Sequence, residues 1–170
     1  MGAWTVPYGI AIALLAAAGI AKVRDPRDTV GALARSGLVV PPVAVRGLAA
    51  FEVGLAVAAL ATGSRTGAAV VGLSYLGFTV FVTQARVRHL PVGSCGCFGR
   101  LETPPSALHV LVNLGCALAA LGAAVVGPLP WLGLVDIASG RAFLGVLLVL
   151  AGAGLAVVLV TVVPRRTGTR

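Results

Sequence analysis

The chain has 170 residues, of which 58% are hydrophobic and 11% charged, and its mean hydropathy is +1.02. Soluble domains carry roughly 25% charged residues, so this composition excludes a water-soluble globular protein and indicates an integral membrane protein. The formal net charge of +8 does not indicate nucleic-acid binding, because the basic residues lie at the ends of apolar runs and are not interleaved with aromatic residues.

Five apolar runs follow one another along the chain, and each is close to the roughly 20 residues that an α-helix needs to cross a hydrocarbon core. They cover Val6–Val23, Val43–Ala61, Ala68–Ala85, Ala107–Val126 and Ala142–Val163. Uninterrupted runs favour helices over a barrel, which would need alternating polarity. The sequence therefore predicts an all-α membrane bundle of four to five spans. We expect one domain over residues 1–170, with a core at 6–126 and an additional span at 142–163.

The segment between the first two runs, Lys22–Pro42, is predicted to hold a short amphipathic helix on the membrane interface. Asp25 is expected to be its N-cap, with Pro26 in the first turn. Val30, Leu33, Ala34 and Leu38 form an apolar stripe, and Pro41-Pro42 stops the segment. An irregular loop is the alternative.

Positive charge is distributed unequally between the two sides of the predicted bundle. One side carries Lys22, Arg24, Arg27, Arg35, Arg46, Arg86, Arg88, Arg100, Arg165, Arg166 and Arg170, and the other carries Arg65 and Arg141. Basic residues accumulate on the cytoplasmic side of membrane proteins. The sequence thus predicts a bacterial plasma-membrane protein with its N-terminus outside. The C-terminus and the connection between the third and fourth runs are then cytoplasmic.

That connection contains Cys95 and Cys97, two of only three cysteines. A Cys-x-Cys disulfide closes a very small ring whose strain makes it easy to reduce, which suits an exchanging dithiol. Gly96 gives the backbone the freedom that such a ring requires. Arg100 and Lys22 would favour the thiolate form. A partial metal site and two incidental small residues are the other interpretations.

A zinc centre is not predicted. Zinc takes about four ligands, and the two loop cysteines supply half of them. His89 and His109 could complete the set, but their spacing fits no common zinc pattern. Cys116 lies inside the fourth run and is expected to be a small buried hydrophobe without a redox role.

Alternation of spans places several polar residues near the same membrane face as the cysteine loop. These are Lys22, Glu52, Gln84, His109 and Asn113. His109 and Asn113 are four residues apart and share a helix face. A polar contact between helices is the favoured interpretation for these two, ahead of catalysis.

Glu52 lies about ten residues into an apolar run, where a carboxylate is costly unless it is paired or protonated. Lys22 and Arg46 are its expected partners. A buried ion pair that fixes the first two spans together is the favoured interpretation. The functional alternative is a proton acceptor or a group that tunes the cysteine site.

With its Cys-Gly-Cys-Phe-Gly string at residues 95–99 between the third and fourth runs, the chain resembles the MauE family of DoxX-like small membrane proteins. The Gly-Ile-Ala-Lys exit at residues 19–22, the basic linker and Glu52 followed by Gly54 also match. The resemblance extends to about Val126. It implies a link to the maturation of methylamine dehydrogenase and to thioredoxin-like partners, and it assigns a thiol–disulfide role to Cys95 and Cys97.

The leading hypothesis is therefore a multi-pass membrane protein that acts in thiol–disulfide exchange. Cys95 and Cys97 would be the exchanging pair. Lys22, Glu52, Arg100, His109 and Asn113 would support that site. The residues indicate no cofactor, and they do not decide whether a quinone or a second thiol protein completes the circuit. The rival hypothesis is a non-enzymatic membrane subunit or small transporter whose loop binds a partner or a metal.

The predicted side of the loop conflicts with the implied partner, because methylamine dehydrogenase matures outside the cytoplasm. Three explanations remain open: the protein serves cytoplasmic thiols, it relays electrons across the membrane, or the span count is wrong by one.

Overall fold

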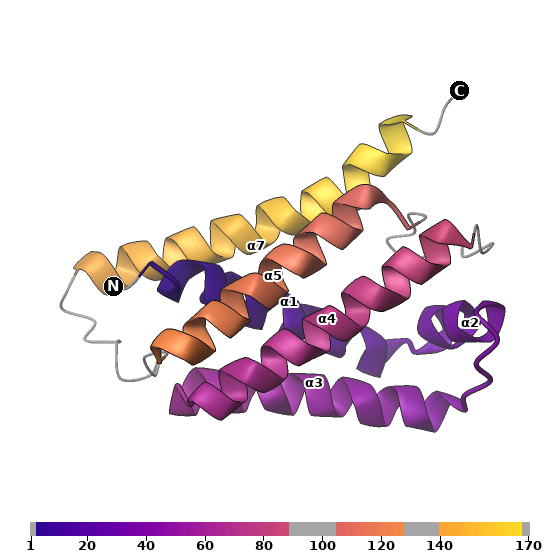
Figure 1. The fold of residues 1–170 in the computed structure, drawn as a ribbon, viewed down its shortest axis with the longest axis horizontal. Coiled ribbons are helices and arrows are strands. Elements are labelled where there is room, and N and C mark those ends of the chain that lie inside the picture. The colour runs from indigo at the N-terminus through magenta and orange to yellow at the C-terminus, as the bar shows by residue number, and fades with distance from the viewer. Residues whose placement is uncertain (1–2, 89–104, 128–139, 168–170) are drawn as a thin grey trace.

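The computed structural model describes the backbone of residues 3–88, 105–127 and 140–167, and the side chains of the last segment over 144–161 (Figure 1). Within these ranges the fold consists of helices and contains no strand. The helices are α1 (Thr5–Arg24), α2 (Arg27–Arg35), α3 (Pro42–Thr62), α4 (Arg65–Val87), α5 (Ala107–Val126) and α7 (Gly140–Thr167). All except α2 are long and apolar enough to cross a membrane, which confirms the predicted helical membrane bundle.

Helix boundaries follow local sequence signals. Pro42 occupies the start of α3, where its missing N–H leaves no hydrogen bond unmade. Gly63 ends the same helix with φ of +56°, a conformation that glycine adopts without strain. Ser64 then caps α4, because its Oγ accepts a hydrogen bond of 3.0 Å from the backbone N–H of Gly67. These signals produce a tight antiparallel turn between α3 and α4.

The predicted amphipathic helix is present as α2, but it begins one residue later than expected. Pro26 occupies the N-cap position, and Asp25 stabilises the start from one residue further back by accepting a 3.2 Å hydrogen bond from the N–H of Arg27. The helix ends at Arg35, before Gly37 with φ of +90°. Ala32 is buried against Phe81 and Ala85 of α4, so α2 packs on the bundle.

Helix α1 occupies the centre of the bundle, packed against α3, α5 and α7, while α4 packs along α5 (Figure 1). The buried face of α1 consists of small and large apolar side chains spaced three or four residues apart, as expected for one face of a helix. Alanines of α3, α4 and α5 meet this face. Small residues allow such close approach in lipid, where water provides no hydrophobic drive between helices.

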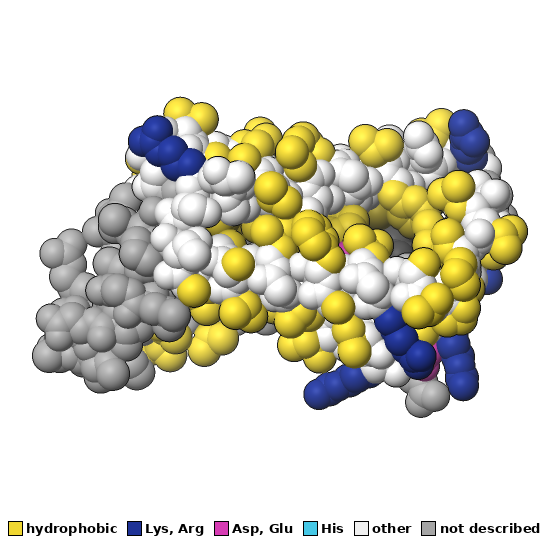
Figure 2. Space-filling model, turned by 90° about the horizontal axis from the view of Figure 1, so that it is seen from below, with side chains coloured by type: hydrophobic (Ala, Val, Ile, Leu, Met, Phe, Trp, Pro, Cys, Tyr) yellow, Lys and Arg dark blue, Asp and Glu magenta, His cyan; other side chains and the backbone are white. Residues whose placement is uncertain are grey.

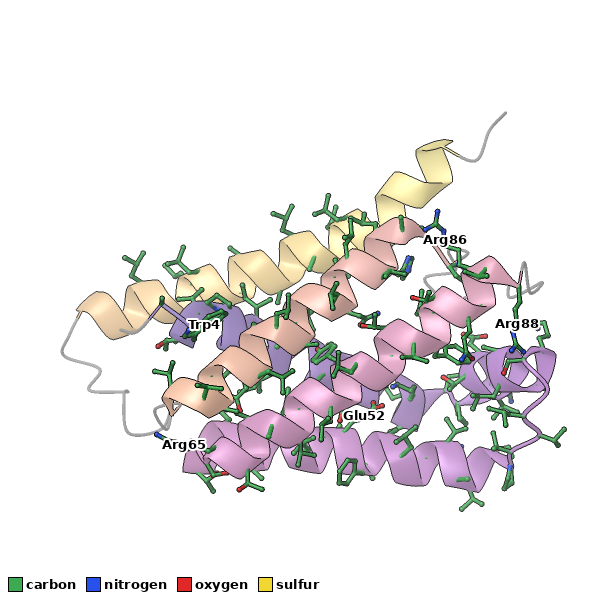
Figure 3. All side chains as sticks on the ribbon, in the orientation of Figure 1. Trp4, Glu52, Arg65, Arg86 and Arg88 are labelled. Carbon is green, nitrogen blue, oxygen red and sulfur yellow. The ribbon has the colours of Figure 1, made fainter. Side chains whose placement is uncertain are left out.

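The two ends of the bundle differ in the number of charged side chains that they carry. Arg86 and Arg88 lie where α4 ends and Arg65 lies at the opposite end, with Glu52 between them in the interior (Figure 3). We call the end formed by the last turns of α1 and α4 and the first turns of α3 and α5 the basic end. Figure 2 shows hydrophobic side chains over the middle of one face and Lys and Arg side chains towards its ends. This is the pattern of a multi-pass membrane protein.

Candidate functional site

The interior of the bundle contains a closed ion pair between α1 and α3. The Nζ of Lys22 lies 2.6 Å from Oε1 and 2.6 Å from Oε2 of Glu52. The two residues are only 4% and 1% exposed. The prediction that Glu52 pairs with Lys22 is confirmed. Arg46 is exposed and lies six residues before Glu52, about 240° around the helix, so it faces away from the pair.

The backbone brings these two side chains together because each lies on the buried face of its helix. Glu52 interrupts a stripe of small residues on α3, between Ala49 and Ala56. Gly19 of α1 faces this stripe, where a Cβ would lie 3.0 Å from the carbonyl oxygen of Ala49 and 3.2 Å from the Cβ of Glu52. The glycine therefore permits the close approach of α1 and α3 one turn before Lys22.

Two aromatic side chains of α4 complete the surroundings of Lys22. The Nζ lies 5.0 Å from the centroid of the Phe78 ring, which is within the range of a cation–π contact. Phe78 meets Tyr75 edge to face, with ring centroids 5.7 Å apart. Sequence reasoning missed both residues. Their signal was a pair of aromatic residues three apart, hence on one face, in a span otherwise rich in Gly, Ala and Val.

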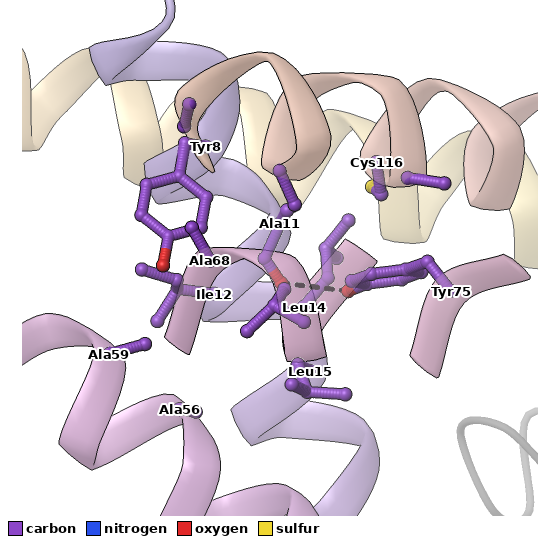
Figure 4. Packing of buried hydrophobic residues seen from close by; sticks show 14 residues of the cluster. Tyr8, Ala11, Ile12, Leu14, Leu15, Ala56, Ala59, Ala68, Tyr75 and Cys116 are labelled. Carbon is purple, nitrogen blue, oxygen red and sulfur yellow. Dashed lines mark hydrogen bonds between the residues drawn. The ribbon is translucent and has the colours of Figure 1, made fainter. Parts of the chain in front are cut away.

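A small pocket of about 30 Å³ lies beside Lys22. It brings together three residues that the sequence had placed at the same membrane face: Lys22, His109 and Asn113. Tyr75 joins them, and the Tyr75 hydroxyl donates a 2.7 Å hydrogen bond to the carbonyl oxygen of Ala11 (Figure 4). The remaining lining is apolar and consists of Leu14, Leu15, Ala18, Phe78, Val112 and Val160.

His109 is held at the start of α5 by Ser106. The Ser106 backbone N–H donates to Nδ1 of the imidazole at 3.3 Å, and the Ser106 Oγ lies 2.8 Å from the same nitrogen. Since a backbone N–H can only donate, Nδ1 is the acceptor, and a neutral ring then carries its hydrogen on Nε2. The buried imidazole is thereby fixed in one orientation between the end of the bundle and the pocket.

The other residues predicted for the site are placed differently. Gln84 is exposed on α4 and does not line the pocket. Cys116 is a buried free thiol of α5, in agreement with its predicted burial. Cys95, Cys97 and Arg100 lie outside the described residues. In the part of the chain that the structure describes, no group of three His, Cys, Asp or Glu side chains could hold a metal ion.

The fold and this polar cluster can be compared with known proteins. No curated protein and no solved structure matches the chain. Residues 1–130 match the family described as "Methylamine utilisation protein MauE". The match covers α1 to α5, and with them the ion pair and most of the pocket. This protein belongs to the MauE family.

Proposed function

We propose that the chain is a plasma-membrane thiol–disulfide exchange protein of methylamine utilisation, with Cys95 and Cys97 as the exchanging pair. The observation that carries the proposal is the position of the polar cluster in a MauE-family protein. The segment with both cysteines leaves α4 after Arg88 and re-enters the described chain just before Ser106, at the basic end. Lys22, Glu52 and His109 lie in the bundle beneath that end.

The basic end supports the chemistry that exchange requires. A thiolate is the attacking species, and nearby positive charge increases its fraction. Arg86 and Arg88 immediately precede the cysteine segment, and Arg100 lies within it. Glu52 neutralises the Lys22 ammonium, so the exposed arginines are the stronger candidates for this role. This assignment differs from the sequence-based expectation, in which Lys22 acted on the thiols directly.

In the proposed reaction, a disulfide of a partner protein oxidises the Cys95–Cys97 dithiol. One thiolate of the pair attacks the disulfide of the partner, forms a mixed disulfide and releases one partner thiol. The second cysteine attacks the mixed disulfide, which leaves a Cys95–Cys97 disulfide and two partner thiols. The reverse sequence introduces a disulfide into a reduced partner. A thioredoxin-like protein is a partner of suitable chemistry in either direction.

The test is thiol trapping with mass spectrometry on the purified protein in lipid. We expect dithiothreitol to expose two alkylation sites in the peptide containing residues 95–97, and mild oxidation to remove both sites together. Cys116 is the internal control, because it is buried in the core and should stay unlabelled in the folded protein. If both loop cysteines stay alkylatable after oxidation, the exchange reaction is excluded and the rival function as a membrane subunit or transporter is favoured.

A second measurement tests the predicted side of the cysteine segment, and with it the explanation that the span count is wrong by one. The charge bias of the bundle favours a cytoplasmic position for the cysteine segment and the C-terminus, with the N-terminus outside. We expect a membrane-impermeant maleimide to label Cys95 and Cys97 in inverted vesicles and not in intact cells. Labelling in intact cells would reverse the proposed orientation and allow direct contact with external partners.

We also infer that all five spans act as one domain. The family match ends at residue 130, before α7. Nevertheless, Ala153, Ala156 and Val157 of α7 pack against the core cluster, and Gly152 faces Ile10 of α1. The last span therefore belongs to the same packed unit as the matched core.

A further inference from the structure

The pocket beside Lys22 has the size of a water site, and its mainly apolar lining includes a few polar residues. Its volume is about 30 Å³, whereas a bound water needs roughly 10–15 Å³ and two to four polar partners. Lys22, His109 and Asn113 contribute such partners from α1 and α5. A metabolite or a cofactor ring does not fit in this volume. The geometry therefore suits about one or two water molecules.

The pocket also completes a polar route through an apolar bundle. Ser106 lies at the basic end and contacts His109 at 2.8 Å. His109 lines the pocket, and so does Lys22, which contacts both carboxylate oxygens of Glu52. An imidazole can take up a proton on one nitrogen and release a proton from the other. With Nδ1 towards Ser106, the ring has the orientation that such a transfer from the bundle end requires.

We propose that this pocket is a hydrated proton relay that connects the basic end of the bundle to Glu52, with His109 as the relaying group. The Ser106 hydroxyl, 2.8 Å from Nδ1, passes a proton to this nitrogen and regains one from the aqueous phase, while Nδ1 gives up its contact with the Ser106 N–H. The proton on Nε2 then passes to water in the pocket. The Lys22 ammonium, which lines the pocket and contacts Glu52, donates one proton to a carboxylate oxygen of Glu52 and regains one from this water. The net change is one new O–H bond on Glu52 and one more positive charge in the pair, and no electron is transferred.

The surroundings contain few groups that could compete for this proton. The titratable side chains on the described elements around the pair and the pocket are Lys22 on α1, Tyr75 on α4 and His109 on α5, with the Cys116 thiol of α5 next to Tyr75. The described part of α7 contributes one residue to the lining, the apolar Val160. The arginines near α2 and at the end of α4 are exposed. Glu52 is thus the acidic group at the inner end of the route.

The experiment measures how fast Glu52 takes up a proton in the full chain in lipid bilayers. After a rapid drop in pH, time-resolved infrared spectroscopy follows the band of a protonated carboxyl group. Loss of this band in Glu52→Gln assigns it to Glu52. We expect His109→Asn to slow its appearance by at least about tenfold, since general acid–base groups typically contribute 10²–10⁴-fold to proton transfer. Asn retains an acceptor near the position of Nδ1, so the contact with Ser106 is preserved.

A matched pair of substitutions tests the pocket itself. Ala18 is buried and lines the pocket, whereas Ala17, the preceding residue of α1, is exposed. Ala18→Val fills the space for water without changing a polar group, and it should slow the appearance of the band. Ala17→Val adds the same methyl groups towards lipid and should leave the rate unchanged.

The outcomes separate clearly. Slowing in both His109→Asn and Ala18→Val supports the relay. Equal rates in the wild type and both variants, or slowing in only one of them, overturns it. A wild-type spectrum without any band that Glu52→Gln removes also overturns it, because Glu52 then takes up no proton. Neither cysteine is needed, so the measurement can be made in a Cys95→Ser, Cys97→Ser protein and is independent of thiol exchange.

Discussion

The half of the bundle around Tyr8 is packed with alanine and glycine, while the half around Lys22 is built from charged and aromatic side chains beside a pocket. In the first half, Tyr8 and Ala11 of α1 are buried among alanines of α3, α4 and α5 (Figure 4). Trp4 covers Gly122 of α5, leaving no room for a Cβ there. In the second half, the Lys22–Glu52 pair fills the equivalent space between α1 and α3.

The difference shows how the two halves depend on single residues. Packing by many small side chains distributes the stabilisation over several helices, and each contact contributes little. A buried ion pair concentrates the stabilisation in two residues, because removing one partner leaves an uncompensated charge in an apolar medium. We therefore expect the largest mutational effects in the half that contains the polar cluster.

The largest effect should come from Lys22→Met. The variant leaves the Glu52 carboxylate buried without its cation, and we expect a loss of about 3–5 kcal/mol in the free energy of unfolding. Unfolding in mixed detergent micelles measures it. The double variant Lys22→Met, Glu52→Leu removes both charges and should recover most of this loss. A double variant as unstable as the single one would contradict the assignment of the cost to an unpaired charge.

The next effect should come from Gly19→Val, which acts on the backbone approach that creates the pair. A Cβ at this position would lie 2.8 Å from Cγ2 of Val53. We expect α1 and α3 to separate and the free energy of unfolding to fall by about 1–3 kcal/mol, as for overpacked cores. Gly54→Val is the matched control, because Gly54 of α3 has open space around it. Equal losses in both variants would show that the cost comes from the helix backbone and not from the interface.

The sequence predicted those features that depend on one helix at a time. Run lengths located the five spans, and the spacing of four residues placed His109 and Asn113 on one face, where both line the pocket. The cost of a carboxylate in lipid predicted a cation beside Glu52, and Lys22 is that cation. These predictions needed only the geometry of a single helix and the thickness of a bilayer.

Features that depend on the rotation of one helix against another were not predictable from the sequence. Arg46 was an equally plausible partner for Glu52 until α3 was placed with its small residues towards α1. Tyr75 and Phe78 were missed because their role depends on α4 facing Lys22. The pocket itself is the space left between four helices of the bundle, α1, α4, α5 and α7, and no periodicity describes such a space.

The smallest effect sharpens the comparison at two buried tyrosines, one in each half. The hydroxyl of Tyr75, beside the pocket, donates to the carbonyl oxygen of Ala11 at 2.7 Å. The hydroxyl of Tyr8 is buried and has no hydrogen-bond partner among the described residues. Tyr75→Phe should therefore lower the free energy of unfolding by about 0.5–1.5 kcal/mol.

Tyr8→Phe is the matched substitution and should leave the stability unchanged or raise it, because it removes a buried polar atom without removing a bond. Thermal unfolding of both variants in the same lipid environment measures the contrast. A loss at Tyr8 as large as that at Tyr75 would mean that the closely packed half also depends on a specific polar contact. The two halves would then differ in degree and not in kind.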